Sequence, residues 1–244
     1  MRPDPYAWSV HGEAVLAVAL LVAGYLYGIR HERVSRVRLA SFFAGALLLT
    51  ATAITPLDAL SFHLLSAHLL QNVVLAEWAP ALVVFGIPPG LAARIAAVRP
   101  VRLLTLPPVA LAIWLGTYFF WHLPWVYDTA LRHPWTLLHL EHALYFAAGC
   151  LLWWPVAHDL PHALDDGARA LYLFAAFVLA SPLGLLLALV PTPVYDFYEE
   201  GGSLWGLSTM NDQQIAGVTM AAEQAIVFFL AFSFYLSRFL REQT

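Results

Sequence analysis

Residues 60–85 read LSFHLLSAHLLQNVVLAEWAPALVVF, and this stretch decides the fold because it is long enough to cross a bilayer as one helix. The rest of the chain has the same character, with 61% hydrophobic and 11% charged residues, whereas soluble domains carry about 25% charged residues. Apolar stretches recur on both sides of it, as in a polytopic helical protein. We therefore predict an all-α transmembrane bundle, a single integral membrane domain over residues 1–244, with seven spans near residues 14–27, 39–54, 60–85, 106–121, 135–156, 168–190 and 215–236.

Three local features refine this prediction. Pro80 lies inside the third predicted span and is expected to bend it, because proline lacks an amide hydrogen and crowds the preceding turn. Residues 87–98, which prolines bracket, are expected to form a short interfacial helix. The N-terminal stretch shows no clear small-residue cleavage site, so we expect the first span to be retained.

The arginines predict the orientation of the chain. Every basic residue is an arginine, and two of them, Arg2 and Arg132, fall on one side of the predicted spans. The other ten fall on the opposite side: Arg30, Arg33, Arg36, Arg38, Arg94, Arg99, Arg102, Arg169, Arg238 and Arg241. By the positive-inside rule the N-terminus lies outside and the C-terminus lies in the cytoplasm, as in a multi-pass protein of the bacterial cell (inner) membrane.

Ligand-type side chains converge on the outer leaflet in this orientation. They come from four predicted spans: His63 and His68 in the third, His122 at the end of the fourth, His139 and His142 at the start of the fifth, and Asp212 and Gln213 at the start of the seventh. Ionisable groups inside a membrane are costly and usually mark a functional site. Histidines scattered through a core would not be expected to share one depth.

Residue spacing indicates which of these side chains share a helix face. His139 and His142 are three residues apart and project from the same side, as do His68 and Asn72, four apart. His63 lies about 140° around the helix from His68. Two imidazoles with a third donor from a neighbouring helix can hold a transition metal, and imidazole suits copper, zinc or iron alike.

Two carboxylates lie deeper in the predicted spans. Glu77 belongs to the third span and Glu223 to the seventh. A carboxylate within a membrane is either hydrogen-bonded to a neighbouring helix or part of a proton path, and the sequence leaves both readings open.

Several classes of protein are excluded because the chain lacks the residue types or motifs that they need. A retinal protein needs a Schiff-base lysine, and the chain has no lysine. The single cysteine, Cys150, excludes a thiolate metal cluster, and no HExxH zinc protease motif is present. Nucleic-acid binding has no support, because the arginines are those expected at cytoplasmic loop ends.

Four motifs, in this order, resemble the CtaG family of cytochrome c oxidase assembly factors: SAHLLQNVVLAEWAPALVVFGIPP (66–89), WHLPWVYDTAL (121–131), HPWTLLHLEHALYFAAGCLLWWPV (133–156) and NDQQIAGVTM (211–220). The resemblance extends from the third predicted span to the seventh. Members of the family are seven-span membrane proteins implicated in maturing the copper-containing oxidase. The resemblance therefore implies a role in metal delivery or oxidase assembly rather than catalysis.

The resemblance also identifies residues on the third predicted span. The family pattern there is similar to H-x-x-x-H, with His68 at the first position and Asn72 in place of the second histidine. An amide cannot replace an imidazole as a strong ligand. The departure implies either that His63 or His122 substitutes, or that this member binds metal weakly or not at all.

On the fifth and seventh spans the resemblance covers two further patterns. The family's H-x-x-E-H maps in looser form onto His139, Glu141 and His142, and its DQ-x-x-G maps onto Asp212, Gln213 and Gly217.

The leading hypothesis is a non-enzymatic metallochaperone or assembly factor that passes copper to a cytochrome c oxidase subunit. Its ligands would be His68, His139 and His142, with Asp212 ligating or orienting an imidazole, and with Asn72, Gln213 and Glu141 supporting the ligands. Two alternatives remain: a haem protein that binds haem between His68 and His142, and a proton-coupled transporter that uses Glu77 and Glu223. The sequence does not decide between a monomer and a homodimer.

Overall fold

The computed structural model describes residues 3–8 and 10–243, which are helical with no β-strand in those ranges. The predicted all-α fold is confirmed. The elements are α1 (Gly12–Ile29), α2 (Arg36–Ile54), α3 (Pro56–Ser61), α4 (Leu65–Val73), the π-helix η1 (Val74–Trp78), α5 (Ala79–Gly86), α6 (Pro89–Ala96), α7 (Arg99–Leu104), α8 (Pro107–Trp121), α9 (Pro124–Arg132), the π-helix η2 (Pro134–Leu138), α10 (His139–Ala157), α11 (Asp166–Leu189), α12 (Asp196–Glu200) and α13 (Thr209–Glu242).

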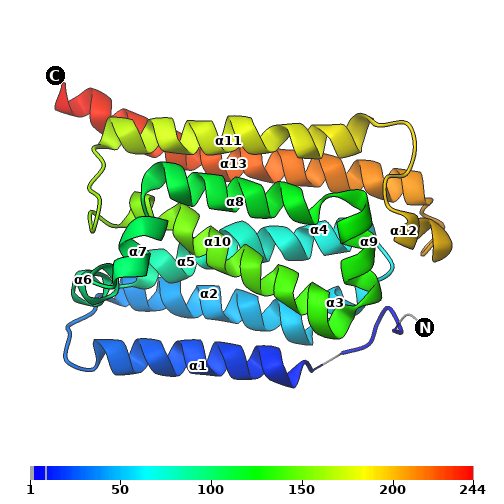
Figure 1. Cartoon of the computed structure of the whole chain (residues 1–244), viewed down its shortest axis with the longest axis horizontal. Coiled ribbons are helices and arrows are strands. Elements are labelled where there is room, and N and C mark those ends of the chain that lie inside the picture. Colours follow the sequence, from blue (N-terminus) through cyan, green and yellow to red (C-terminus); the bar gives the residue numbers. More distant parts are fainter. Residues whose placement is uncertain (1–2, 9, 244) are drawn as a thin grey trace.

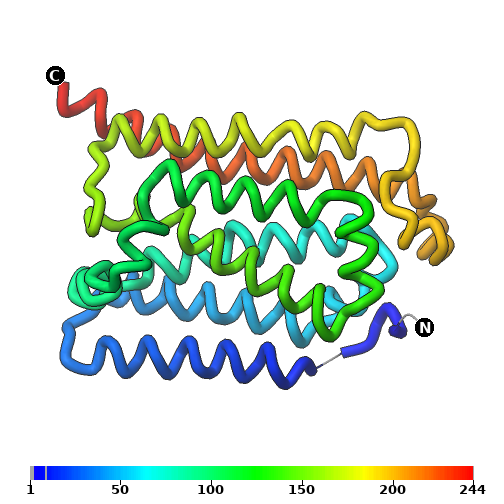
Figure 2. The backbone as a smooth tube through the Cα atoms, in the orientation of Figure 1, coloured from blue at the N-terminus to red at the C-terminus, as the bar shows by residue number. Residues whose placement is uncertain are grey.

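The long helices lie along one common axis, and the short helices close the two ends of the bundle (Figure 1). Helices α3, α9 and α12 lie at the end where α1 begins, and α6 and α7 lie at the end where α13 finishes. Helices α11 and α13 run side by side, while α1 forms the opposite edge of the bundle (Figure 2). Sites that involve α3, α9 and α12 are therefore far from the C-terminal end of α13.

Five helical segments are long and apolar enough to cross a membrane: Gly12–Ile29, Arg36–Ile54, Leu65–Gly86, Asp166–Leu189 and Thr209–Glu242. A sixth candidate is the pair α8 and α9, which is bent by 73°. The chain is therefore a membrane protein of several apolar helices. Helix α10 coincides with the fifth predicted span, and the total of seven spans remains a prediction.

The third predicted span begins later than its hydropathy suggests. Helix α3 ends at Ser61, and a new helix starts at Leu65 after a short break. The amides that open α4 have no acceptor in the side chain of their own N-cap residue, Leu64. The Asp212 carboxylate, at the start of α13, accepts hydrogen bonds from the amides of Leu65 and Ser66 instead. A side chain distant in sequence thus fixes the start of this helix.

The π-helix η1 accommodates Pro80 within the same rod. Pro80 has no amide hydrogen, so an α-helical bond to the Ala76 carbonyl cannot form. The chain widens by one residue just before it, and the Ala79 amide bonds to the Val74 carbonyl in the π pattern. Gly149 of α10 packs against this site, since a Cβ there would lie 2.2 Å from the Ala76 oxygen.

Arginine side chains link neighbouring segments at the end of the bundle where α6 and α7 lie. Arg94 on α6 pairs with Glu32 at 2.7 Å, and Arg38 donates to the carbonyls of Phe85 and Ile87 at 3.0 and 2.6 Å. Helix α6 confirms the short helix predicted within residues 87–98, and its place at the membrane interface remains a prediction. Arg2 lies outside the described residues, and the predicted orientation remains a prediction.

His158 belongs to the same end of the bundle, just after α10. Its Nε2 lies 3.1 Å from the Val84 carbonyl. Burial lowers the pKa of His158 to about 4, so the ring is neutral at pH 7 and donates its proton to that carbonyl.

Candidate metal centre

The centre of the candidate site is a buried cluster between α4 and α10. His68 comes from α4, and Glu141 and His142 come from the first turn of α10. The side chains of His68 and Glu141 are fully buried, and His68 Nε2 lies 3.8 Å from Glu141 Oε1. The rings of His68 and His142 are edge to face, with centroids 6.2 Å apart. We call His68, Glu141 and His142 the inner cluster.

Hydrogen bonds fix the tautomer of His68. Its Nδ1 lies 3.1 Å from the Tyr198 hydroxyl, which donates its own proton to the Ser61 carbonyl at 2.7 Å. A hydroxyl with its single proton committed can only accept from Nδ1, so the neutral ring carries its proton there. The Nε2 lone pair of His68 therefore faces Glu141.

Asn72 fixes the carboxylate of Glu141. Asn72 lies one turn after His68 on α4. Its side-chain amide nitrogen donates a hydrogen bond to Glu141 Oε1 at 3.0 Å. Asn72 thus holds a carboxyl oxygen of Glu141 beside His68. The lone pairs of His68 Nε2 and of this oxygen repel each other, and a cation bound to both atoms would remove that repulsion.

Five buried polar atoms around this cluster have no hydrogen-bond partner within the described residues. They are His68 Nε2, Asn72 Oδ1, Glu141 Oε2, His142 Nε2 and His122 Nε2. Each unsatisfied buried group costs about 1–3 kcal/mol, so a group of them requires an explanation. Imidazole nitrogens with a carboxylate oxygen are the donors that copper, zinc and iron accept, and this donor set fits such an ion.

His122 lies beside the inner cluster and packs against aromatic side chains. Its Nδ1 bonds to the Tyr118 carbonyl at 2.8 Å, and the ring of Tyr127 lies 5.0 Å from His68 and 5.9 Å from His122. Tyr195, in the segment between α11 and α12, stacks on Tyr127 at 4.0 Å and donates to the His122 carbonyl at 3.2 Å. Burial, and then the negative charge of Glu141, raise the pKa of Tyr195. This hydroxyl therefore stays protonated and donates its proton to the His122 carbonyl.

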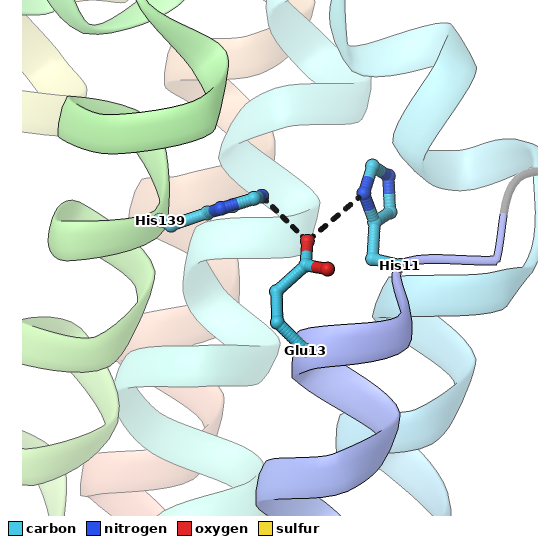
Figure 3. Close-up of side chains that lie close together, drawn as sticks. All are labelled: His11, Glu13 and His139. Atoms are coloured by element: carbon cyan, nitrogen blue, oxygen red, sulfur yellow. Dashed lines mark ion pairs between the residues drawn. The ribbon is translucent and has the colours of Figure 1, made fainter.

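His139 belongs to a second group, which we call the outer trio: His11, Glu13 and His139. Figure 3 shows the Glu13 carboxylate between the two imidazoles. Glu13 Oε1 lies 3.5 Å from His11 Nδ1 and 3.4 Å from His139 Nε2. One donor atom from each residue lies within 4.8 Å of the others, which is close enough for one metal ion.

A large cavity extends from the outer trio to His142 of the inner cluster. It has a volume of about 1230 Å³ and lies between α1, α2 and α10. His139 and His142, one helical turn apart, both line it, together with His11 and Glu13. The predicted common face of His139 and His142 is therefore the face that opens on this cavity.

Three other candidate ligands have different partners. The Asp212 carboxylate receives hydrogen bonds from the first amides of α4. Gln213 Oε1 accepts from the Val194 amide at 2.7 Å, and His63 Nε2 lies 2.7 Å from the Pro3 carbonyl. The structure thus uses Asp212 and Gln213 to join α13 to neighbouring segments, and it brings neither of them into contact with the inner cluster within the described ranges.

The two deep carboxylates meet polar partners on neighbouring helices. Glu77, on η1, accepts a hydrogen bond from Gln224 on α13 at 3.0 Å, and Gln224 also bonds to the Tyr118 hydroxyl at 2.9 Å. The indole of Trp78 donates to Glu223. Glu77 and Glu223 are thus both hydrogen-bonded to side chains of a neighbouring helix, which is the first of the two alternatives that the sequence left open.

His11 and Glu13 are not among the ligands that the sequence predicts, and Glu141 is predicted only to support the ligands. His11 and Glu13 precede the first span predicted from the sequence, and their contact with His139 joins residues more than a hundred positions apart. The only local signal was the pairing of a histidine and a glutamate two residues apart before an apolar stretch. Tertiary packing of α1 on α10 decides the rest.

Comparison with known proteins gives one match. No curated protein and no solved structure matches the chain. The sequence profile of the cytochrome c oxidase caa3 assembly factors, Caa3_CtaG, matches residues 12–242, from the start of α1 to the end of α13. This match confirms the resemblance carried by the four motifs. With nearly its whole length matched, the chain belongs to the family of cytochrome c oxidase caa3 assembly factors.

Proposed function

We propose that this protein is a non-enzymatic assembly factor of the bacterial cell membrane that holds copper at the inner cluster and passes it to a cytochrome c oxidase subunit. One observation carries the proposal: His68 Nε2, Glu141 Oε2 and His142 Nε2 are buried close together without hydrogen-bond partners in the described part of the chain, and Glu141 Oε1 lies 3.8 Å from His68 Nε2. Membership of the oxidase assembly family supports copper as the ion over zinc and iron.

The proposed ligand set differs from the one expected from motifs. Nε2 of His68 and of His142 would supply two nitrogens, and Glu141 would supply a carboxylate oxygen that Asn72 holds in place. Glu141 thus takes the anionic role first expected of Asp212. Groups that orient a metal ligand contribute strongly to affinity, and the Tyr198 hydroxyl has that role for His68.

Transfer to the oxidase would occur on the outer side of the membrane. The arginine-rich loops near α6 and α7 favour a cytoplasmic position for that end, which puts α3, α9, α12 and the inner cluster nearer the outer surface. Seven spans with the N-terminus outside are part of this proposal.

Copper delivery can be tested in cells that lack the gene and carry a variant in its place. We expect oxidase purified from cells with His142→Gln to contain less copper than oxidase from wild-type cells, at equal membrane levels of the assembly factor. His31→Gln is the matched control, because His31 is exposed at the opposite end of the chain's first span. Equal copper in the oxidase from all three strains would contradict the proposal.

A proton path is the second candidate function, favoured by a small cavity beside the deep carboxylates. This cavity, of about 10 Å³, is lined by Asn72, Glu77, His122 and Tyr145, so it connects the region of the inner cluster with Glu77. That volume is close to the minimum for one water molecule. Proton uptake into vesicles that is lost on Glu223→Gln would support this function, and unchanged uptake would exclude it.

A further inference from the structure

We propose that His11, Glu13 and His139 form a second metal site, separate from the inner cluster, whose ion fastens the outer half of α1 to α10. The site would take a divalent transition ion such as Zn(II) or Cu(II). The proposal goes beyond copper delivery, because it assigns a structural and gating role to residues outside the inner cluster.

The donor geometry is the first argument. Glu13 Oε1 lies between His11 Nδ1 and His139 Nε2, at 3.5 and 3.4 Å (Figure 3). Three donor atoms within 4.8 Å of one another can move onto one ion with small rotations of the side chains. Two neutral imidazoles and a carboxylate form the nitrogen and oxygen set that borderline divalent ions prefer.

The orientation of His11 is the second argument. Its other nitrogen, Nε2, lies 2.8 Å from the buried carboxylate of Asp58 on α3. Imidazoles that bind a metal through one nitrogen almost always donate the other N–H to a carboxylate, a carbonyl or a water. Asp58 would hold the proton of His11 on Nε2 and leave the Nδ1 lone pair directed at Glu13. The trio is thus supported in the way that known metal ligands are.

The weak attachment of α1 is the third argument. Its only buried residue is Tyr25, near the other end of the helix, where it stacks on Phe42 at 3.6 Å and donates to the Gly86 carbonyl. Among the described residues, the polar contacts of the outer half of α1 with the rest of the bundle are those of His11 and Glu13. An ion shared by the trio would close α1 over the large cavity, and its loss would let α1 move away.

The position of the trio also suggests a route. His139 and His142 both line the cavity, so an ion released from the trio would find the next imidazole one turn further along α10. Glu13 is 53% exposed, whereas His142 Nε2 is buried, so the trio would exchange ions with solvent and the inner cluster would retain them. This step alone rests on the proposed function.

The test uses the full-length protein in detergent, freed of metal by chelation and titrated with Zn(II) alone. We expect Glu13→Gln and His11→Gln each to remove one Zn(II) ion from the number bound, while His68→Gln/His142→Gln keeps that ion. His133→Gln is the matched control, since His133 is an exposed histidine near His139 that bonds only to its own helix turn.

A distance measurement distinguishes a metal site from simple ion pairs. Spin labels on Leu16→Cys and Leu144→Cys, in a Cys150→Ala background, report the separation of α1 from α10, since both leucines are exposed. Zn(II) is expected to narrow the distance distribution, and Glu13→Gln is expected to abolish that effect. The same Zn(II) number and the same distances in wild type and Glu13→Gln would overturn the proposal. If the inner variant alone lost Zn(II), the second site would fall and metal binding at the inner cluster would stand. If only the trio variants lost Zn(II), the second site would stand, and the inner cluster would not bind Zn(II).

Discussion

Glu141 supplies the carboxyl group of the inner cluster. It sits on α10 directly before His142, and its carboxylate faces His68 because Asn72 donates a hydrogen bond to it. Changing Glu141→Gln keeps the shape and an oxygen for Asn72 but removes the carboxylate that would bind the ion. We expect the affinity for copper to fall by at least about 10–100-fold, the loss that accompanies removal of groups that only orient a ligand. Competition with a chelator of known affinity measures this.

Glu199→Gln is the control for that change, because Glu199 is an exposed acid on α12 at the same end of the bundle. Its copper affinity is expected to equal that of the wild type. If Glu141→Gln also bound copper as the wild type does, the carboxylate would have no part in the site.

Gly149 lets α10 approach the Pro80 region, and this predicts opposite effects for two glycine substitutions. A Cβ on Gly149 would meet the Ala76 oxygen at 2.2 Å, and backbone cannot move aside cheaply. We expect Gly149→Ala to destabilise the protein by about 1–3 kcal/mol, as overpacking does. Gly116→Ala, where nothing lies within 4 Å of the added carbon, should stabilise it by up to about 1 kcal/mol through helix propensity.

Thermal unfolding in detergent compares the two variants. A lower midpoint for Gly149→Ala with an unchanged or higher midpoint for Gly116→Ala is expected. Equal midpoints would mean that the contact between α10 and the Ala76 carbonyl does not form.

Helices α11 and α13 pack through a pair of glycines. A Cβ on Gly217 would lie 2.5 Å from the Ala188 amide nitrogen and 2.6 Å from the Gly184 oxygen. Small residues of this kind allow close backbone packing of membrane helices. We expect Gly217→Ala to raise amide hydrogen exchange in residues 166–189 and 209–242, because the two helices must separate.

The control is Gly24→Ala in α1, where an added carbon meets no atom within 4 Å. Mass spectrometry of deuterium uptake measures both variants. Exchange in α11 and α13 that stays at the wild-type level in Gly217→Ala would show that these helices tolerate a wider spacing.

At the level of the helices, hydropathy predicted where the helices lie in the sequence better than it predicted their internal geometry. The fourth predicted span ends at Trp121, as α8 does, and the interfacial helix was expected near α6. The π-helix η1 and the break before Leu65 were not expected. Both depend on contacts with other helices: Gly149 packs beside the carbonyl freed by Pro80, and Asp212 caps α4 from a position 147 residues away.

Only the part of the candidate site that depends on helical periodicity could be predicted from the sequence. The spacing of His139 and His142 predicted a shared face, and both do line one cavity. It did not reveal that His139 meets Glu13 on α1 while Glu141 faces inward to His68, because those neighbours come from other helices. Residue spacing fixes directions around one helix, whereas partners depend on how helices pack.

The arrangement of the whole molecule predicts its accessibility from the two sides of the membrane. In a Cys150→Ala background, Ser203→Cys lies between α12 and α13, and Ala163→Cys lies between α10 and α11. Both positions are exposed. We expect a membrane-impermeant maleimide to label Ser203→Cys in intact cells, and to label Ala163→Cys only after the membrane is opened. The reverse labelling pattern would show that the chain has the opposite orientation. It would then exclude delivery of copper on the outer side of the membrane.

The central claim is that the buried nitrogen and oxygen atoms of the inner cluster hold copper. The most direct test is elemental analysis of the purified, copper-loaded protein, comparing the wild type with His68→Gln/His142→Gln, with His31→Gln as the control. The account predicts that the double variant retains about one copper ion per chain fewer than the wild type and the control, because its two imidazole ligands are gone. Equal copper content in the three proteins would contradict it.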